Sequence, residues 1–214
     1  MHPAVRITDI EAQVRMNAYS PDLSSILLIF SPYNGESAGI NREFLQKVPD
    51  YHYHSGPQTA CYCVGYSVFE TEPDLARGRV VSLSKDFGWP LSFFYPQLFH
   101  AVRSFIQEKL LQKWRYVGGV DLLLFGVERS SEAPVQWERA AIAQSSKLLA
   151  DGSFRDAEEM IRWMLNLNEA AQGRLVPDDV NPELARKQFR AKLKSVSRLV
   201  AGSVAGSALK LIGA

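Results

Sequence analysis

Two continuous apolar runs dominate the hydrophobic pattern of the chain. Residues 26–30 read Ile-Leu-Leu-Ile-Phe and residues 122–125 read Leu-Leu-Leu-Phe, with no polar position in either run. A strand that is covered on both faces needs apolar side chains at every position, so both runs predict central strands of a sheet. Between them, residues 97–114 repeat apolar positions at helical spacing after Pro96, which predicts a long helix.

Weaker patterns fill in the remaining elements. Helical spacing predicts short helices at residues 7–14 and 40–48, and the Cys-, Tyr-, Val- and Phe-rich residues 59–69 predict a strand, with a further strand at 79–83. Residues 134–150 and 154–167, separated by Asp-Gly-Ser, predict a helical hairpin. The alternative for the first half of that hairpin is an edge strand at residues 137–145.

These elements predict an α/β fold with a small, mostly parallel sheet wrapped by helices, then a C-terminal helical hairpin and a basic amphipathic helix. We expect a globular domain at 1–172, a linker at 173–181 and the C-terminal helix at 182–214. That helix is expected to begin at Asn181-Pro182, a capping residue followed by a proline in the first turn.

The order of helices and strands over residues 5–168 resembles that of a thioredoxin-like domain. The resemblance concerns order alone. Where that family carries paired redox cysteines, this chain has Ser-Pro-Tyr-Asn-Gly at residues 31–35, and where the family carries a proline it has Gly119-Val120. Thiol-disulfide exchange is therefore not implied, and a small doubly wound sheet explains the order equally well.

Charge is distributed unevenly along the chain. Seven of the 24 basic residues and none of the 23 acidic residues fall at positions 186–214, so that segment carries +7 and the remainder carries −6. The composition is that of an ordinary globular protein, and residues 1–9 lack the features of an export signal. The expected location is the cytoplasm, with peripheral attachment to a membrane as an open alternative.

The basic C-terminal segment is the strongest functional signal. Its apolar residues recur at three- and four-residue steps with basic residues around them, and two glycines four residues apart allow close helix approach. The predicted binding residues are Arg186, Lys187, Phe189, Arg190, Leu193, Lys194, Val196, Arg198, Val200, Gly202, Val204 and Gly206.

Several occupants suit such a helix. An anionic membrane surface or the groove of a protein partner fits its charge and its apolar face, and self-association through the glycines is a further prediction. The stripe would also suit the acidic body of the same chain. Nucleic acid ranks lower because Phe189 is the one aromatic residue in the basic segment.

Two weaker chemical hypotheses concern the body. The loop at residues 31–39 follows a buried strand and precedes a helix, a position that can hold an anion, although it lacks a phosphate-binding motif. His52, His54, Cys61 and Cys63 have the side chains of a tetrahedral zinc site if residues 52–54 and 61–63 pair as a hairpin. No residue is predicted to be catalytic, and zinc is the one cofactor considered.

The sequence therefore favours a non-enzymatic adaptor or effector that binds through its C-terminal helix. The alternative is a small α/β enzyme with its site at the carboxyl ends of the buried strands, near residues 31–39 and 118–121, or at the zinc site.

Overall fold

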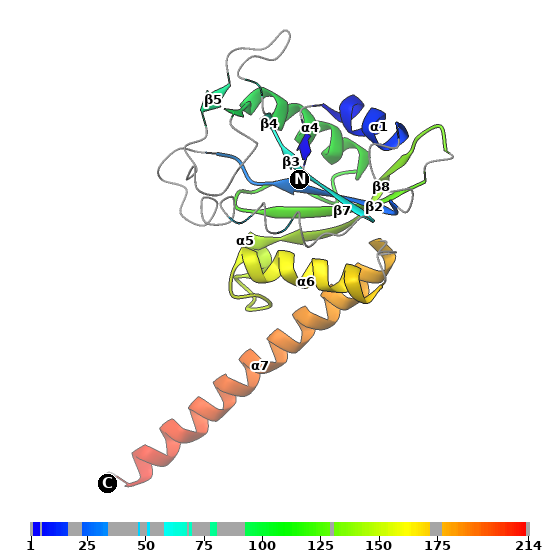
Figure 1. Ribbon diagram of the computed structural model, residues 1–214. Helices are drawn as coiled ribbons and strands as arrows, with labels where there is room; N and C mark the ends of the chain where they lie inside the picture. The colour runs from blue at the N-terminus through cyan, green and yellow to red at the C-terminus, as the bar shows by residue number, and fades with distance from the viewer. Residues whose placement is uncertain are drawn as a thin grey trace.

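The protein is described here by a computed structural model. The structure describes residues 2–4, 6–16, 23–33, 47, 51, 58–67, 69, 78–80, 93–128, 131–171 and 177–212. Figure 1 shows how its main helices and strands are arranged. They are β1 (His2–Ala4), α1 (Ile7–Arg15), β2 (Ser25–Phe30), β3 (Thr59–Val64), α4 (Pro96–Lys109), β7 (Asp121–Val127), β8 (Val135–Gln144), α5 (Ser145–Leu148), α6 (Ala157–Ala170) and α7 (Pro177–Ile212).

The main sheet has five strands in the order β1-β3-β2-β7-β8. β3 runs parallel to both β1 and β2, whereas β7 runs antiparallel to both β2 and β8. The α/β class and the two central strands are therefore confirmed. The expectation of a mostly parallel sheet is wrong, because two of the four strand pairs are antiparallel. β7 lies antiparallel to β2, and a short chain reversal after β7 then returns the chain as its antiparallel neighbour β8.

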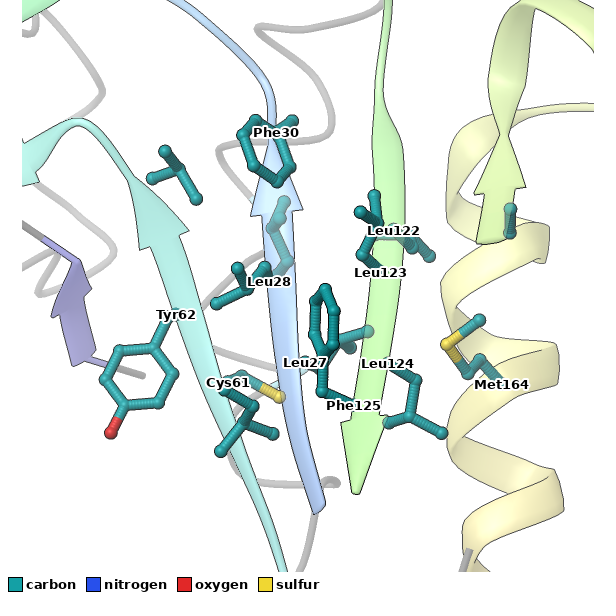
Figure 2. Packing of buried hydrophobic residues seen from close by; sticks show 14 of the residues in the cluster. Leu27, Leu28, Phe30, Cys61, Tyr62, Leu122, Leu123, Leu124, Phe125 and Met164 are labelled. Atoms are coloured by element: carbon teal, nitrogen blue, oxygen red, sulfur yellow. The ribbon is translucent and has the colours of Figure 1, made fainter. Parts of the chain in front are cut away.

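Helices cover both faces of this sheet (Figure 1). Leu124 of β7 lies opposite Leu27 of β2, and Figure 2 shows these side chains on the sheet beside Met164 of α6. On the other face, Phe30 packs against Phe99 of α4 with ring centroids 5.7 Å apart. Every residue of β2 is buried, as the continuous apolar run predicts.

Residues 135–144 form an edge strand rather than the first half of a helical hairpin, so the hairpin prediction is wrong and its alternative is correct. Val135 and Trp137 are buried while Gln136 and Glu138 are exposed, which is the two-residue period of a strand. Trp137 packs on Phe125 of β7, with ring centroids 5.1 Å apart. The second predicted helix is present as α6, and the short α5 follows β8 directly.

A second, three-stranded sheet has the order β4-β6-β5, formed by Tyr66–Ser67, Phe93–Phe94 and Arg79–Val80. It confirms the prediction of strands near 59–69 and 79–83 in part. The short helix expected at 7–14 is present as α1, and the long one at 97–114 as α4. The helix expected at 40–48 lies outside the described residues, apart from position 47. The thioredoxin-like element order is not confirmed.

The C-terminal helix begins earlier than expected. α7 starts at Pro177 and continues through Pro182, which removes one backbone N–H from the helical ladder. Val180 and Leu184 of its first turns are buried in the main hydrophobic core. The start of the helix is therefore part of the domain, while its far end projects away from the sheet (Figure 1).

Gly65 gives a test of the packing between β3 and α4. Its φ is +83°, and a Cβ there would lie 2.8 Å from Phe99 Cβ and 2.9 Å from Phe94 Cε2. Gly65→Ala should lower the free energy of unfolding by about 2–4 kcal/mol, from backbone strain and overpacking together. Urea denaturation measures this quantity. Gly152→Ala is the control, because Gly152 has φ +73° but nothing within 4 Å. It should lose only the strain of about 1–2 kcal/mol, and equal losses in the two variants would contradict the packing at Gly65.

Candidate functional site

The first turns of α7 are attached to the sheet. Val180 is fully buried and Leu184 nearly so, and both belong to the core that includes Leu124 and Met164. Asp178 also forms an ion pair with Arg139 of β8, although both side chains are exposed. An exposed pair adds little stability, so the two apolar residues are the main anchor.

The next turn of α7 contacts α6 and the segment that connects α5 to α6. Lys187 Nζ lies 4.3 Å from the centroid of the Phe154 ring and 3.4 Å from Glu159 Oε1. Gln188 Nε2 donates a hydrogen bond of 3.2 Å to Asp151 Oδ2. These contacts fix the orientation of α7 where it leaves the domain, and they show that one part of the basic segment does dock on its own acidic body.

Beyond Gln188, the apolar residues of the stripe whose side chains the structure describes are not covered. Phe189 is 63% exposed and Leu193 is 54% exposed, although both are large apolar residues. The structure thus brings six of the predicted binding residues onto one described stretch of helix, namely Arg186, Lys187, Phe189, Arg190, Leu193 and Lys194. The side chains of the other six lie outside the described part of the structure, namely those of Val196, Arg198, Val200, Gly202, Val204 and Gly206.

Two adjoining pockets lie where α6 and the turn at residues 151–153 face α7, and both are lined by Trp163 and Lys187. The first, of about 470 Å³, is lined by three basic and three acidic side chains, those of Arg155, Arg162, Lys187, Asp156, Glu158 and Glu159. The second, of about 330 Å³, is lined by four basic side chains and one acidic one, those of Arg186, Lys187, Arg190, Lys194 and Glu183. The second pocket, called the α7 pocket below, is therefore the electropositive one.

Sequence reasoning identified the basic side chains of the α7 pocket but not its opposite wall. Trp163 sits on a half-buried position of α6, and Gly152 and Ser153 form the turn before it. The amphipathic pattern of 154–167 would have shown that Trp163 lies off the buried face defined by Met160 and Met164. No sequence pattern indicates that this face meets α7.

A second polar cluster lies at the end of the main sheet that the alternative hypothesis names. Asp121 is fully buried at the start of β7, opposite Phe30 and Gln144. Its Oδ2 accepts hydrogen bonds of 2.9 Å from Trp114 Nε1 and from Gln144 Nε2. Its Oδ1 has no hydrogen-bond partner among the described residues, and neither has the buried Ser31 Oγ at the end of β2. Of the loop at 31–39, residues 34–39 lie outside the described residues.

Burial shifts the ionisation of Asp121. Desolvation raises its pKa from 3.8 to about 6, against the opposing effect of the hydrogen bonds from Gln144 and Trp114. An acid with this pKa is partly protonated near neutral pH, and such groups occur both in catalytic sites and in buried structural networks.

The proposed zinc ligands are only partly described. Cys61 and Cys63 are buried in the middle of β3 and form no disulfide, and burial raises the pKa of Cys63 well above its usual value. β1 and β2 occupy both edges of β3 at Tyr62 and Cys63, so no edge is free there for the hairpin that the hypothesis assumed. His52 and His54 lie outside the described residues. The zinc site stays an untested prediction.

Among the described residues, no group of three or more His, Cys, Asp or Glu side chains could hold a metal ion. None of the helices in the described part of the chain is both long enough and apolar enough to cross a membrane. Comparison of the chain with models of protein families, with curated proteins and with solved structures gives no match.

The buried carboxyl group gives a prediction of pH dependence. Because the pKa of folded Asp121 lies above that of the unfolded chain, its contribution to stability is full below pH 4 and is lost as the pH rises through 6. Asp121→Asn does not titrate. The difference in free energy of unfolding between Asp121→Asn and the wild type should therefore grow in favour of the variant by roughly 2–3 kcal/mol between pH 4 and pH 7.

Urea denaturation at a series of pH values measures these free energies of unfolding. Glu158→Gln is the control, for which the difference from the wild type should change with pH in the opposite direction. The ion pair with Lys47 lowers the pKa of Glu158, so the wild-type residue stabilises the fold above the unfolded pKa and loses that effect as the pH falls. A difference between Asp121→Asn and wild type that is constant with pH would refute the raised pKa of Asp121.

Proposed function

We propose that this protein is a binding protein without catalytic activity, and that α7 attaches it peripherally to an anionic membrane surface. The observation that carries the proposal is the exposure of Phe189 and Leu193 on the part of α7 that has basic but no acidic residues, in a helix that projects from the domain (Figure 1). Two large apolar side chains facing water on a single helix are typical of a surface that another molecule covers.

The charge distribution supports a membrane over other partners. The segment 186–214 carries +7 with no acidic residue, so it is attracted to an anionic bilayer and repelled by a second copy of itself. A bilayer interface accepts both the apolar stripe and the flanking basic residues at once. The acidic body, at −6, disfavours contact of the domain itself with the same surface. Attachment through α7 alone, with the domain held away from the membrane, follows from this polarity.

The membrane proposal predicts a specific binding pattern in a liposome co-sedimentation assay. The full chain should bind vesicles that contain phosphatidylserine, should not bind neutral phosphatidylcholine vesicles, and should bind more weakly as salt increases. Phe189→Ser combined with Leu193→Ser should weaken binding at least about tenfold, because both side chains lose apolar area that the interface buries.

The matched control uses exposed apolar residues of the body. Phe69 is 65% exposed and Val117 is 61% exposed, and neither lies on α7. Phe69→Ser combined with Val117→Ser should leave vesicle binding unchanged. Equal loss in both double variants, or absence of binding by the full chain at low salt, would refute the proposal and favour a protein partner for α7.

A second candidate function is a small enzyme with its site at the end of the main sheet. The buried Asp121 Oδ1 and Ser31 Oγ, neither of which has a hydrogen-bond partner among the described residues, favour it. Phosphate titration followed by the nuclear magnetic resonance shifts of residues 31–33 and 119–121 tests the anion-binding form, and the zinc content of the purified protein tests the metal form. If phosphate causes no shifts and the purified protein contains no stoichiometric zinc, the enzyme hypothesis loses both of its forms and the binding protein is favoured.

A further inference from the structure

One side of α7 lies against the domain, and its residues follow a regular spacing. Val180 and Leu184 are buried in the main core, and Lys187 and Ala191 are half-buried. These four residues, called the inner face below, are separated by steps of four, three and four, which is the spacing of one side of a helix. Lys187 and Ala191 also line the α7 pocket, together with Trp163 of α6. The contact with the domain therefore continues along the inner face as far as Ala191.

A second set of residues on α7 repeats the same spacing two positions further along the chain. Pro182, Arg186, Phe189 and Leu193 are exposed and are also separated by steps of four, three and four. Two residues of an α-helix correspond to a rotation of roughly 200° about its axis. These four residues, called the outer face below, therefore point almost directly away from the domain. Ala185 is exposed as well and lies on the same side, one turn before Phe189.

The outer face begins within the turns of α7 that dock on the domain. Pro182 lies between the buried Val180 and Leu184 in the sequence, so these turns contact the core on one side and water on the other. α7 continues as one helix, so the outer face runs on from Pro182 to Leu193. In Figure 1, α6, the main sheet and α4 lie together on one side of α7. The domain therefore leaves the outer face open to a flat surface.

The charges along this part of α7 suit an anionic surface. The exposed acidic residues Asp178 and Asp179 precede Pro182. After Pro182 the sequence has a single acidic residue, Glu183, which is half-buried and forms an ion pair with Arg186. An anionic bilayer repels the first turn of α7 and attracts the remainder, so contact with such a bilayer would begin at Pro182.

We propose that the outer face of α7, from Pro182 to Leu193, lies flat on an anionic bilayer, and that the inner face holds the domain on the opposite side of the helix. This inference rests on the membrane attachment proposed above and adds the contact surface and the orientation of the domain. The docked turns of α7 belong to the membrane contact together with Phe189 and Leu193. α6, the main sheet and α4 then follow in this order with increasing distance from the bilayer (Figure 1).

Two alanines on opposite sides of α7 provide a matched test. Ala185→Leu adds three carbons on the side that the bilayer covers, so the full chain should bind phosphatidylserine vesicles at least about fivefold more tightly. Ala191→Leu makes the same change on the inner face, where the α7 pocket of about 330 Å³ has room for it, and should leave vesicle binding unchanged. Alanine and leucine are both strong helix formers, so neither substitution should weaken α7 itself. Co-sedimentation with the vesicles measures both affinities.

Substitution of the same two alanines by glutamate gives a test of opposite sign. Ala185→Glu and Ala191→Glu change the net charge of the chain equally, so the general attraction to the vesicle falls equally in both variants. Ala185→Glu also places a carboxylate at the bilayer surface. It should therefore weaken binding at least about fivefold more than Ala191→Glu does.

Equal changes at the two positions, or a larger change at Ala191, would overturn the proposed orientation, while binding by the wild-type chain would still support the membrane attachment. Absence of vesicle binding by the wild-type chain would overturn both. Urea denaturation shows whether each variant is folded. The leucine and glutamate pairs test the orientation independently, so an unfolded variant in one pair leaves the other pair to decide.

Discussion

Burial of the antiparallel pair β2–β7 on both faces is the constraint on which the rest of the structure depends. Each residue of Ser25–Phe30 and of 121–126 is buried, so the chain must supply an apolar cover above and below. On one face, Phe99 of α4 packs against Phe30. On the other face, Met164 of α6 lies beside the sheet (Figure 2). The first turns of α7 add to this core through Val180 and Leu184. This requirement fixes where α7 starts and the direction in which it leaves the domain.

The same constraint explains which parts of the fold the sequence could predict. The runs at 26–30 and 122–125 have no alternative to burial on both faces, and the stripe of α4 is long enough to fix its period. β8 was ambiguous because residues 135–138 alternate while Ala140, Ala141 and Ala143 suit a helix equally well. Its pairing with β7 decided the outcome, and pairing is a tertiary contact. Strand direction was unpredictable for the same reason, since an apolar run buries equally well in either orientation.

The candidate site also has parts that the sequence could predict and parts that depend on tertiary contacts. Periodicity and charge identified the residues of α7, because a stripe flanked by basic residues is a local pattern. Sequence could not show that Phe189 and Leu193 are exposed, because their exposure depends on which other elements lie beside this part of α7. Nor could it pair Lys187 with Phe154 and Glu159, or place Trp163 in one pocket with Arg190, because these residues lie far apart in the sequence. Asp121 was visible in the sequence as a polar residue at the edge of an apolar run. That its Oδ1 has no hydrogen-bond partner among the described residues is a property of the packed structure alone.

Attraction between the basic segment and the acidic body does not require that all of α7 folds back on the domain. A helix is a stiff rod, and 36 residues extend over roughly 54 Å. Contacts at Val180, Leu184, Lys187 and Gln188 set the direction of this rod, and a continuous helix cannot then bend its later turns onto the surface without a kink. The one proline in α7, Pro182, precedes most of these contacts and so supplies no hinge beyond them. The contacts that hold the start of α7 against the body therefore also keep Phe189 and Leu193 exposed, and a partner that covers them must come from outside the described fold.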